Sequence, residues 1–322
     1  MTTSTQAEPS NFVHTALFYR SEQQYLDKVV PFITDGLAMG QPVLVAVPAD
    51  KLALLNDALG DTAAEVTMAD ARKVARNPTG ILGGPEGAFA AKHADRPVRM
   101  VGEIVWPERT ADEYPACVQH EALVNTALSS CVGMGLCPYD AGELDAGVLA
   151  DARATHPLVW QAGSSAHRSA EYAPDDAWAR YNQPLSGNPM AVTYIVKVPE
   201  DLGAARAFVT RYARWLRLSP NCIADLQLIA TELATNSLQH TGGGCRLAFW
   251  QQDGQVVCEA SDSGRLDDPL AGRRVAAADA ASGRGLLVVN ALADLVRVHA
   301  APSGTTIHAY LRLEQASGCH DA

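Results

Sequence analysis

The chain lacks the features that mark membrane, secreted and zinc-knuckle proteins. No apolar run reaches the eighteen residues needed to span a membrane. The opening MTTSTQAEPSN has neither the basic nor the apolar region of a secretion signal, so we expect residues 1–10 to form a disordered tail. The seven cysteines are an odd number without a C-x-x-C pair. They are typical of reduced thiols, which predicts a cytoplasmic protein rather than a disulfide framework.

Positive charge is also scarce. The net charge of −11 disfavours a general affinity for nucleic acid or for an anionic membrane, because like charges repel. A length of 322 residues favours two domains, and 48% apolar with 19% charged residues is ordinary for globular protein.

A phosphate-binding loop is missing from the place where a nucleotide-binding α/β domain would carry it. The segment Tyr19–Gln23 after the first expected strand has no glycine and no G-K-S/T motif. Strands alternate with helices through this half, which predicts a mostly parallel sheet with helices on both faces. Strands are expected at 15–19, 42–47, 64–68, 98–105, 132–137 and 157–161, and helices near 22–38, 49–59, 86–93, 113–129 and 143–154.

Several polar residues stand out in this half, some at the ends of expected strands. Ligands of open α/β sheets favour the carboxyl ends of strands, so these residues are candidates to bind a ligand. Ordinary structural roles remain the alternative for each one, with Glu121 and Asn125 one turn apart on what could be a helix surface. A metal site made of His14, Cys137 and His156 is a further alternative. The candidates are His14, Glu103, Trp106, Glu121, Asn125, Cys137, Tyr139 and His156.

Taken together, these residues resemble the MEDS sensory domain, named for methanogens, methylotrophs and a dichloromethane regulator. The resemblance covers residues 11–162. It implies a RecA-like α/β fold without a phosphate loop, and a domain that senses a small organic molecule. It rests on His14–Tyr19, Pro31–Leu37, Gly102-Glu103 with Trp106, Glu121 to Asn125, Cys137–Asp140 and His156-Pro157.

Proline, glycine and serine interrupt the chain over residues 163–190, where periodicity is lost. We expect a linker, either a free tether or a coupling arm. Trp178 and Tyr181 are three residues apart and could form one docking turn.

The second half predicts a smaller α/β domain over 191–313, followed by a tail at 314–322. Asp253-Gly254 is a two-residue hairpin signal between two alternating segments. Ser219-Pro220 is a helix start. Strands are expected at 191–198, 245–252, 255–262, 295–300 and 305–313, and helices over 201–218, from Ser219-Pro220 through His240, and over 286–294.

The helix that ends near His240 carries a polar stripe beside its apolar stripe. Glu232, Asn236 and His240 are each four residues apart and share one face. A carboxylate and a carboxamide one turn apart can hold a hydrated Mg²⁺ ion beside a phosphate, because Mg²⁺ takes oxygen ligands. A solvated helix face is the alternative interpretation.

Later motifs favour a nucleotide site. Asp262 ends a strand just before Gly264, so its carboxylate could accept a hydrogen bond from an adenine amino group. Gly283 and Gly285 precede a helix, whose N-terminal N–H groups favour phosphate oxygens. Thr305 could reach the same adenine edge. Each motif alone is usually a turn or a cap, but their order is unlikely to arise by chance.

This order of motifs resembles the GHKL ATPase family, and within it the anti-sigma serine kinases, over residues 190–313. The resemblance implies a Bergerat-type α/β sandwich that binds ATP and Mg²⁺, with an antiparallel or mixed sheet and helices on one face. Glu232 would be the general base and Asn236 the Mg²⁺ ligand. Asp262, followed by Gly264, would bind adenine with the support of Thr305. Gly283, Arg284 and Gly285 would lie at the phosphates.

The sequence departs from the family where Leu266 replaces a second glycine, and where the expected lid at 266–282 is short. No phospho-accepting histidine helix precedes the domain. The expected function is an anti-sigma-type serine kinase biased by the sensory domain. Its partner would be a sigma factor or a STAS-type anti-anti-sigma protein, and the kinase could form a homodimer. The alternatives are an ATP-binding switch without phosphotransfer, and a hydrolase that uses Cys137 and His156.

Overall fold

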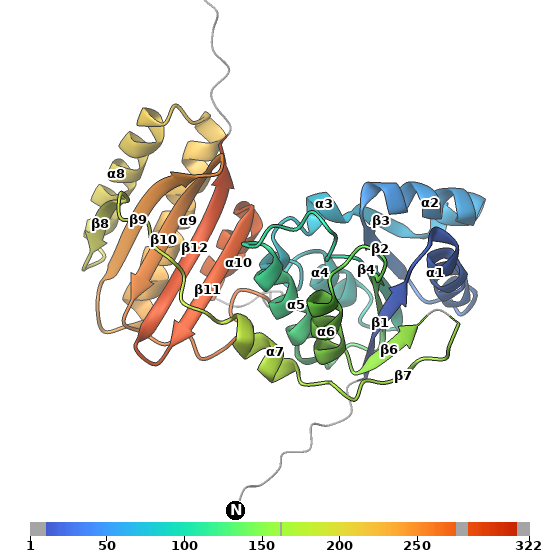
Figure 1. Cartoon of the computed structure of the whole chain (residues 1–322). Helices are drawn as coiled ribbons and strands as arrows, with labels where there is room; N and C mark the ends of the chain where they lie inside the picture. Colours follow the sequence, from blue (N-terminus) through green and yellow to red (C-terminus); the bar gives the residue numbers. More distant parts are fainter. Residues whose placement is uncertain (1–10, 162, 275–282, 314–322) are drawn as a thin grey trace, which may run out of the picture. The chain divides into compact units, whose positions relative to one another are not determined.

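A computed structural model describes residues 11–161, 163–274 and 283–313. The expected tails at 1–10 and 314–322, and residues 275–282 of the expected lid, lie outside the described residues. The chain divides between Tyr181 and Asn182 into two compact units. Figure 1 labels the elements of each unit. Within the described ranges, no helix combines the length and the apolar character needed to cross a bilayer.

The first unit is built on a seven-stranded sheet in the order β3-β2-β4-β5-β1-β6-β7. Every neighbouring pair is parallel except β6 and β7, which confirms the predicted mostly parallel sheet. The strands are β1 (Phe12–Tyr19), β2 (Val43–Val47), β3 (Thr67–Asp70), β4 (Val98–Gly102), β5 (Gly133–Asp140), β6 (Leu158–Gln161) and β7 (His167–Arg168).

Helices cover both faces of this sheet. Successive side chains of β1 point to opposite faces and therefore enter two separate cores. Leu17 and Tyr19 enter one core with residues of α1 and α2. Ala16 and Phe18 enter the other, with Cys117 of α5. The helices are α1 (Glu22–Ala38), α2 (Ala49–Leu59), α3 (Ala71–Val74), α4 (Pro85–Lys92), α5 (Tyr114–Ala127), α6 (Ala146–Thr155) and α7 (Pro174–Tyr181), with short 3₁₀ turns η1 (Gly60–Glu65) and η2 (Pro78–Gly80).

Strand β5 continues through Pro138 to Asp140, beyond the 132–137 predicted. A proline usually ends a central strand, because it cannot donate a ladder hydrogen bond. Here the register of β4 with β5 ends at Leu136, so no strand on that side needs an N–H from residue 138. The strand therefore carries Cys137 and Tyr139 within it rather than at its end.

The range predicted as a linker contains the helix α7, which packs on the first unit. Asp151 of α6 accepts hydrogen bonds from the hydroxyls of Tyr114 and Tyr181, at 2.7 and 2.5 Å. It also pairs with the Arg180 guanidinium at 2.5 Å. The single docking turn considered at Trp178 and Tyr181 is therefore part of an eight-residue helix, whose last turn is fixed by a buried carboxylate.

The second unit is an antiparallel five-stranded sheet in the order β11-β12-β10-β9-β8. Asp253 and Gly254 join β9 to β10 with φ angles of 48° and 73°, the positive values of the predicted tight hairpin. The elements are β8 (Val192–Val196), α8 (Asp201–Trp215), α9 (Pro220–His240), β9 (Cys245–Gln252), β10 (Gln255–Asp262), α10 (Gly285–Leu292), β11 (Leu295–Ala301) and β12 (Gly304–Arg312).

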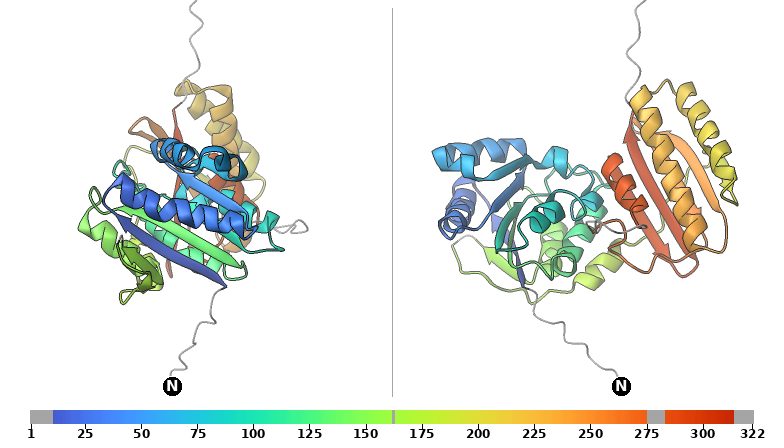
Figure 2. Two further views of the ribbon diagram at one scale, coloured as in Figure 1. Left: turned by 90° about the vertical axis from the view of Figure 1, so that its right-hand side faces the viewer. Right: turned by 180° about the vertical axis from the view of Figure 1, so that it is seen from behind.

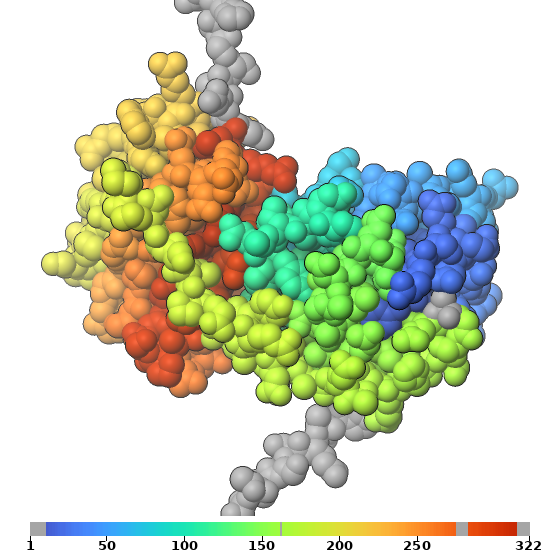
Figure 3. Space-filling view, in the orientation of Figure 1, coloured from blue at the N-terminus to red at the C-terminus, as the bar shows by residue number. Residues whose placement is uncertain are grey.

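The helices of this unit lie over one face of its sheet (Figure 2). Leu226 and Leu233 of α9 meet Leu247 and Phe249 of β9 in one buried core. The chain that follows α7 crosses the opposite face, as the yellow-green segment in Figure 3 shows. There the carboxamide of Asn182 makes two hydrogen bonds with the backbone of Ala300, at 2.8 and 3.0 Å.

Candidate functional site

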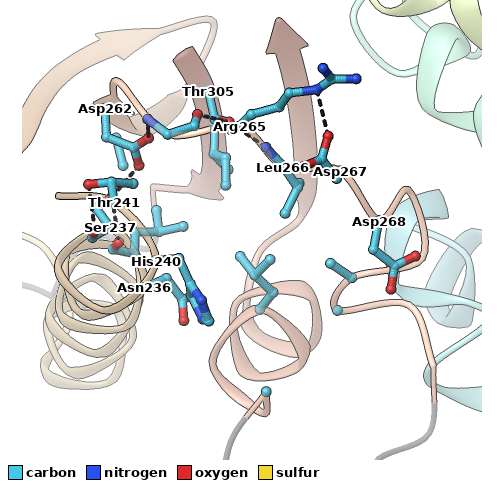
Figure 4. A pocket seen from close by; sticks show the side chains of 18 of the residues that line it. Asn236, Ser237, His240, Thr241, Asp262, Arg265, Leu266, Asp267, Asp268 and Thr305 are labelled. Carbon is cyan, nitrogen blue, oxygen red and sulfur yellow. Dashed lines mark hydrogen bonds and ion pairs between the residues drawn. The ribbon is translucent and has the colours of Figure 1, made fainter. Parts of the chain in front are cut away.

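A cavity of about 540 Å³ lies in the second unit between α9, the end of β10, the chain that follows it, α10 and the start of β12 (Figure 4). Its volume is within the usual range of small-molecule sites. Five of the residues predicted for ATP line it, namely Asn236, Asp262, Gly264, Gly283 and Thr305.

Helix α9 brings its polar stripe to this cavity. The helix begins at the Ser219 cap, whose hydroxyl accepts the Cys222 N–H at 3.2 Å. Its apolar stripe is held in the core, so the stripe beside it faces the cavity. Asn236 and His240 line the cavity, whereas Glu232, one turn earlier, is not among its lining residues. The Nδ2 atom of Asn236 is buried and has no hydrogen-bond partner within the described ranges, which leaves this carboxamide available to a ligand.

The carboxylate of Asp262 is fixed from two sides. It accepts the hydroxyl of Ser237 at 2.5 Å and the backbone N–H of Gly264 at 2.8 Å. An ionised carboxylate has about four acceptor positions, so it can still accept from a bound ligand. Because Ser237 follows Asn236 on α9, this hydrogen bond between Ser237 and Asp262 holds Asp262 beside the polar stripe of α9 that contains Asn236.

Thr305 stands opposite Asp262 in the β10–β12 ladder. Its hydroxyl donates to the carbonyl of Gly264 at 2.8 Å and accepts the N–H of Leu266 at 3.2 Å. The threonine therefore shapes the loop after β10. Leu266, which stands where the family often has glycine, also lines the cavity.

Glycine is required where α10 meets α9. A Cβ atom on Gly285 would lie 2.8 Å from Glu232 Oε2 and 3.0 Å from Asn236 Oδ1, closer than side chains normally approach. Gly283 has a φ of 87°, in the left-handed region that favours glycine. Arg284 lies between them, is exposed, and is not among the cavity-lining residues.

A second cluster lies in the first unit, where the structure brings together five of the eight predicted ligand candidates. His14, Glu121, Cys137 and His156 are buried, and one ligand atom from each lies within 4.8 Å of the others. The hydroxyl of Tyr139 donates to Glu121 Oε1 at 3.2 Å. Glu121 is therefore not on the helix surface that one alternative supposed, and His14 stands inside β1.

Burial dominates the acid–base behaviour of this cluster. It lowers the pKa of His14 and of His156 to about 3, with the neighbouring His14 ring adding to the effect at His156. It raises the pKa of the Cys137 thiol well above its usual value, and the carboxylate of Glu121 adds to this shift. Within the protein alone, burial therefore favours neutral imidazoles and a protonated thiol near pH 7.

The other three candidates have different partners. Glu103 accepts the hydroxyl of Tyr19 at 3.0 Å. The ring of Trp106 lies 3.7 Å from the guanidinium carbon of Arg109, a cation–π contact. Asn125 donates to the backbone carbonyl of Thr155 at 3.4 Å. None of the three supplies an atom to the four-residue cluster.

Comparison with known families agrees with this division of the chain. Residues 13–157 match the family model described as MEDS, the methanogen/methylotroph, DcmR sensory domain. Residues 195–311 match the histidine kinase-like ATPase domain. The chain joins a MEDS domain to a histidine kinase-like ATPase domain. The buried cluster thus belongs to the MEDS domain and the 540 Å³ cavity to the ATPase domain.

Two solved structures show limited similarity. The RsbU and RsbW domains of Rv1364c from Mycobacterium tuberculosis match with 19% identity and a TM-score of 0.32, over 41% of this chain and 34% of that one. The chain therefore spans about a third of that protein's length. The SiaB–SiaC complex from Pseudomonas aeruginosa matches with 15% identity and a TM-score of 0.31, over 37% of this chain and 88% of that one. No curated protein matches the chain.

Sequence reasoning missed Ser237 in the ATPase domain, and Glu86 and His120 in the MEDS domain. Ser237 follows Asn236 and turns toward the sheet, where it meets Asp262. Its small polar side chain on the apolar side of α9 was the available signal. Glu86 and His120 approach to 3.6 Å beside the buried cluster, and burial raises the pKa of Glu86 to about 8. Nothing in their spacing pairs them.

Proposed function

We propose that the ATPase domain binds ATP with Mg²⁺ and transfers the γ-phosphoryl group to a serine of a partner protein. The observation that carries this proposal is the meeting of Asn236 and Asp262 at one cavity, with Thr305 opposite Asp262. Asp262 keeps acceptor capacity for an adenine amino group. Leu233 and Ile307 also line the cavity, and their apolar side chains would contact the faces of the adenine ring.

The phosphates would lie toward Asn236 and the start of α10. Gly283 lines the cavity ahead of the helix, whose first N–H groups favour anions. Asn236 would hold Mg²⁺, which neutralises charge on the phosphates during phosphoryl transfer. Glu232, one turn earlier, would accept the proton of the serine hydroxyl.

The partner class follows from the motif order, which resembles that of the anti-sigma serine kinases. The partner would be a sigma factor or a STAS-type anti-anti-sigma protein. The MEDS domain would sense a small molecule and bias the kinase.

A binding switch without phosphotransfer is the second candidate, and one observation favours it. Glu232 is absent from the cavity lining, and its carboxylate lies against Gly285. A general base must reach the proton that it removes. If Glu232 stays there when ATP is bound, the domain would bind ATP and a partner without transferring phosphate.

The test combines ATP binding with label transfer in the full chain. The Asn236→Ala variant should lose ATP·Mg²⁺ binding in calorimetry, whereas Asn221→Ala, the same change at an exposed position of α9, should keep it. With γ-labelled ATP and recombinant STAS-type proteins of the same genome, Glu232→Ala should keep ATP binding and lose turnover by about 10²–10⁴-fold.

The possible results separate the two candidates. Label on a serine of the partner supports the kinase. A stable, ATP-dependent complex without label supports the switch. Tight ATP·Mg²⁺ binding by Asn236→Ala would contradict the assignment of the metal ligand in both.

A further inference from the structure

The MEDS domain holds four metal-ligating side chains from separate elements around one buried point. His14 comes from β1, Glu121 from α5 and Cys137 from β5, and His156 directly follows α6. We propose that these four side chains bind one transition-metal ion, and that the ion is Zn²⁺. This inference is independent of the kinase proposal.

The distances between the ligand atoms fit a tetrahedral ion. The Nε2 atom of His14 lies 3.2 Å from Cys137 Sγ and 3.2 Å from Glu121 Oε2. The same carboxylate oxygen lies 3.7 Å from Cys137 Sγ and 3.5 Å from His156 Nε2. With Zn–N, Zn–O and Zn–S bonds of about 2.0–2.3 Å, the corners of a tetrahedron lie about 3.3–3.8 Å apart. Small shifts of the side chains would therefore complete the site.

Neighbouring groups orient two of the ligands toward the same point. The carbonyl of Ala152 lies 2.8 Å from His156 Nδ1, and because a carbonyl can only accept, Nδ1 carries the proton. The lone pair of Nε2 therefore faces the cluster. The hydroxyl of Tyr139 occupies Glu121 Oε1 and leaves Oε2 for the cluster. Such outer hydrogen bonds are usual behind metal ligands.

Without a cation, two hydrogen-bond acceptors, His156 Nε2 and Glu121 Oε2, face each other with no proton between them. The bare Nε2 of His156 lies 3.5 Å from Glu121 Oε2, and it is buried with no hydrogen-bond partner in the described part of the chain. The carboxylate oxygen already faces His14 Nε2 at 3.2 Å and Cys137 Sγ at 3.7 Å, so several ligand atoms crowd the same point. A metal ion satisfies both lone pairs at once.

The ligand set and its charge select the ion. Two imidazoles and a sulfur exclude Mg²⁺ and Ca²⁺, which take oxygen ligands, and favour Zn²⁺. On binding, the Cys137 thiol loses its proton to solvent and a Zn–S bond forms. One thiolate and one carboxylate then balance the two positive charges, so no net charge is buried. Four protein ligands form a closed site.

Metal content of the full chain gives the first test. Protein purified from zinc-supplemented cells should contain about one Zn per chain by elemental mass spectrometry. Cys137→Ala and His156→Ala should lose it. Cys117→Ala should keep it, because Cys117 is also buried in the same domain but lies outside the cluster. Retention of the metal by both cluster variants would overturn the proposal, as would a metal-free wild-type protein that fails the next test.

A second measurement does not depend on the folding of variants. Wild-type protein stripped by a chelator should take up one Co²⁺, with the thiolate-to-cobalt charge-transfer band and the intense visible bands of a tetrahedral site. Zn²⁺ should displace it. Unfolding of the MEDS domain on chelation, reversed by Zn²⁺, would equally support the site. A chelated protein that stays folded and gives no cobalt spectrum would show that the cluster is held by hydrogen bonds alone.

Discussion

Glu103 shows how one side chain can set the pH response of the MEDS domain. Its carboxyl is buried, and burial raises its pKa to about 8, although the hydrogen bond from Tyr19 opposes the shift. The folded state therefore holds this proton more tightly than the unfolded chain, whose ordinary value is about 4.5. The stability from this group is fully present below pH 4.5 and falls as the pH rises to about 8.

The Glu103→Gln variant tests the predicted direction of this change in stability with pH. Glutamine keeps an acceptor for Tyr19 but cannot ionise. Its free energy of unfolding in urea should match that of wild type near pH 4.5 and exceed it by about 4–5 kcal/mol at pH 9, since the pKa is raised from 4.5 to about 8 and one pKa unit corresponds to about 1.4 kcal/mol. Glu108→Gln, at an exposed side chain, should follow wild type at every pH. Parallel curves for wild type and Glu103→Gln would show that the carboxyl does not titrate in this range.

At the scale of elements, the approach of α10 to α9 depends on Gly285. An alanine there would press its methyl group against Glu232 and Asn236. We expect Gly285→Ala to weaken ATP·Mg²⁺ binding at least about 10-fold in calorimetry, because Asn236, which lines the cavity, must shift from its position. The circular dichroism spectrum should be unchanged.

Gly203→Ala provides the control for this change. Gly203 lies in α8, and a methyl group there meets no atom within 4 Å. This variant should bind ATP·Mg²⁺ as wild type does and gain about 0.5–1 kcal/mol of stability, because alanine favours helix. Unchanged ATP binding by Gly285→Ala would show that the close approach of α10 to α9 does not contribute to nucleotide binding.

Sequence patterns predicted the elements best where local chemistry decides them. The Ser21 cap and Gly40 bracket α1, and Asp253-Gly254 requires the turn between β9 and β10. The predictions were wrong or incomplete where tertiary contacts determine the secondary structure. β5 passes Pro138 because β4 has already ended, and α7 forms where Asp151 binds its last turn.

The two sites differ in how far sequence could predict them. Resemblance to a family placed Asn236 and Asp262 in one cavity, but not Ser237, whose contact with Asp262 needs the packing of α9 on the sheet. For the MEDS cluster, sequence analysis grouped His14, Cys137 and His156 as an alternative metal site, but it did not place Glu121 with them. His14 and Cys137 meet because β1 and β5 are parallel neighbours, and strand order cannot be read from one sequence.

Two compact units in one molecule predict two unfolding transitions in calorimetry. ATP·Mg²⁺ at about 100 times its dissociation constant should stabilise the ATPase domain by about 2.7 kcal/mol, which raises one transition by about 5–10 °C. Asn236→Ala should abolish that rise. A zinc chelator should lower the other transition. If ATP·Mg²⁺ raises both transitions, or if one transition responds to both additions, the domains share a coupling free energy, which a sensory domain needs in order to bias a kinase. Fully separate responses would show that the two sites do not communicate in the unpartnered chain.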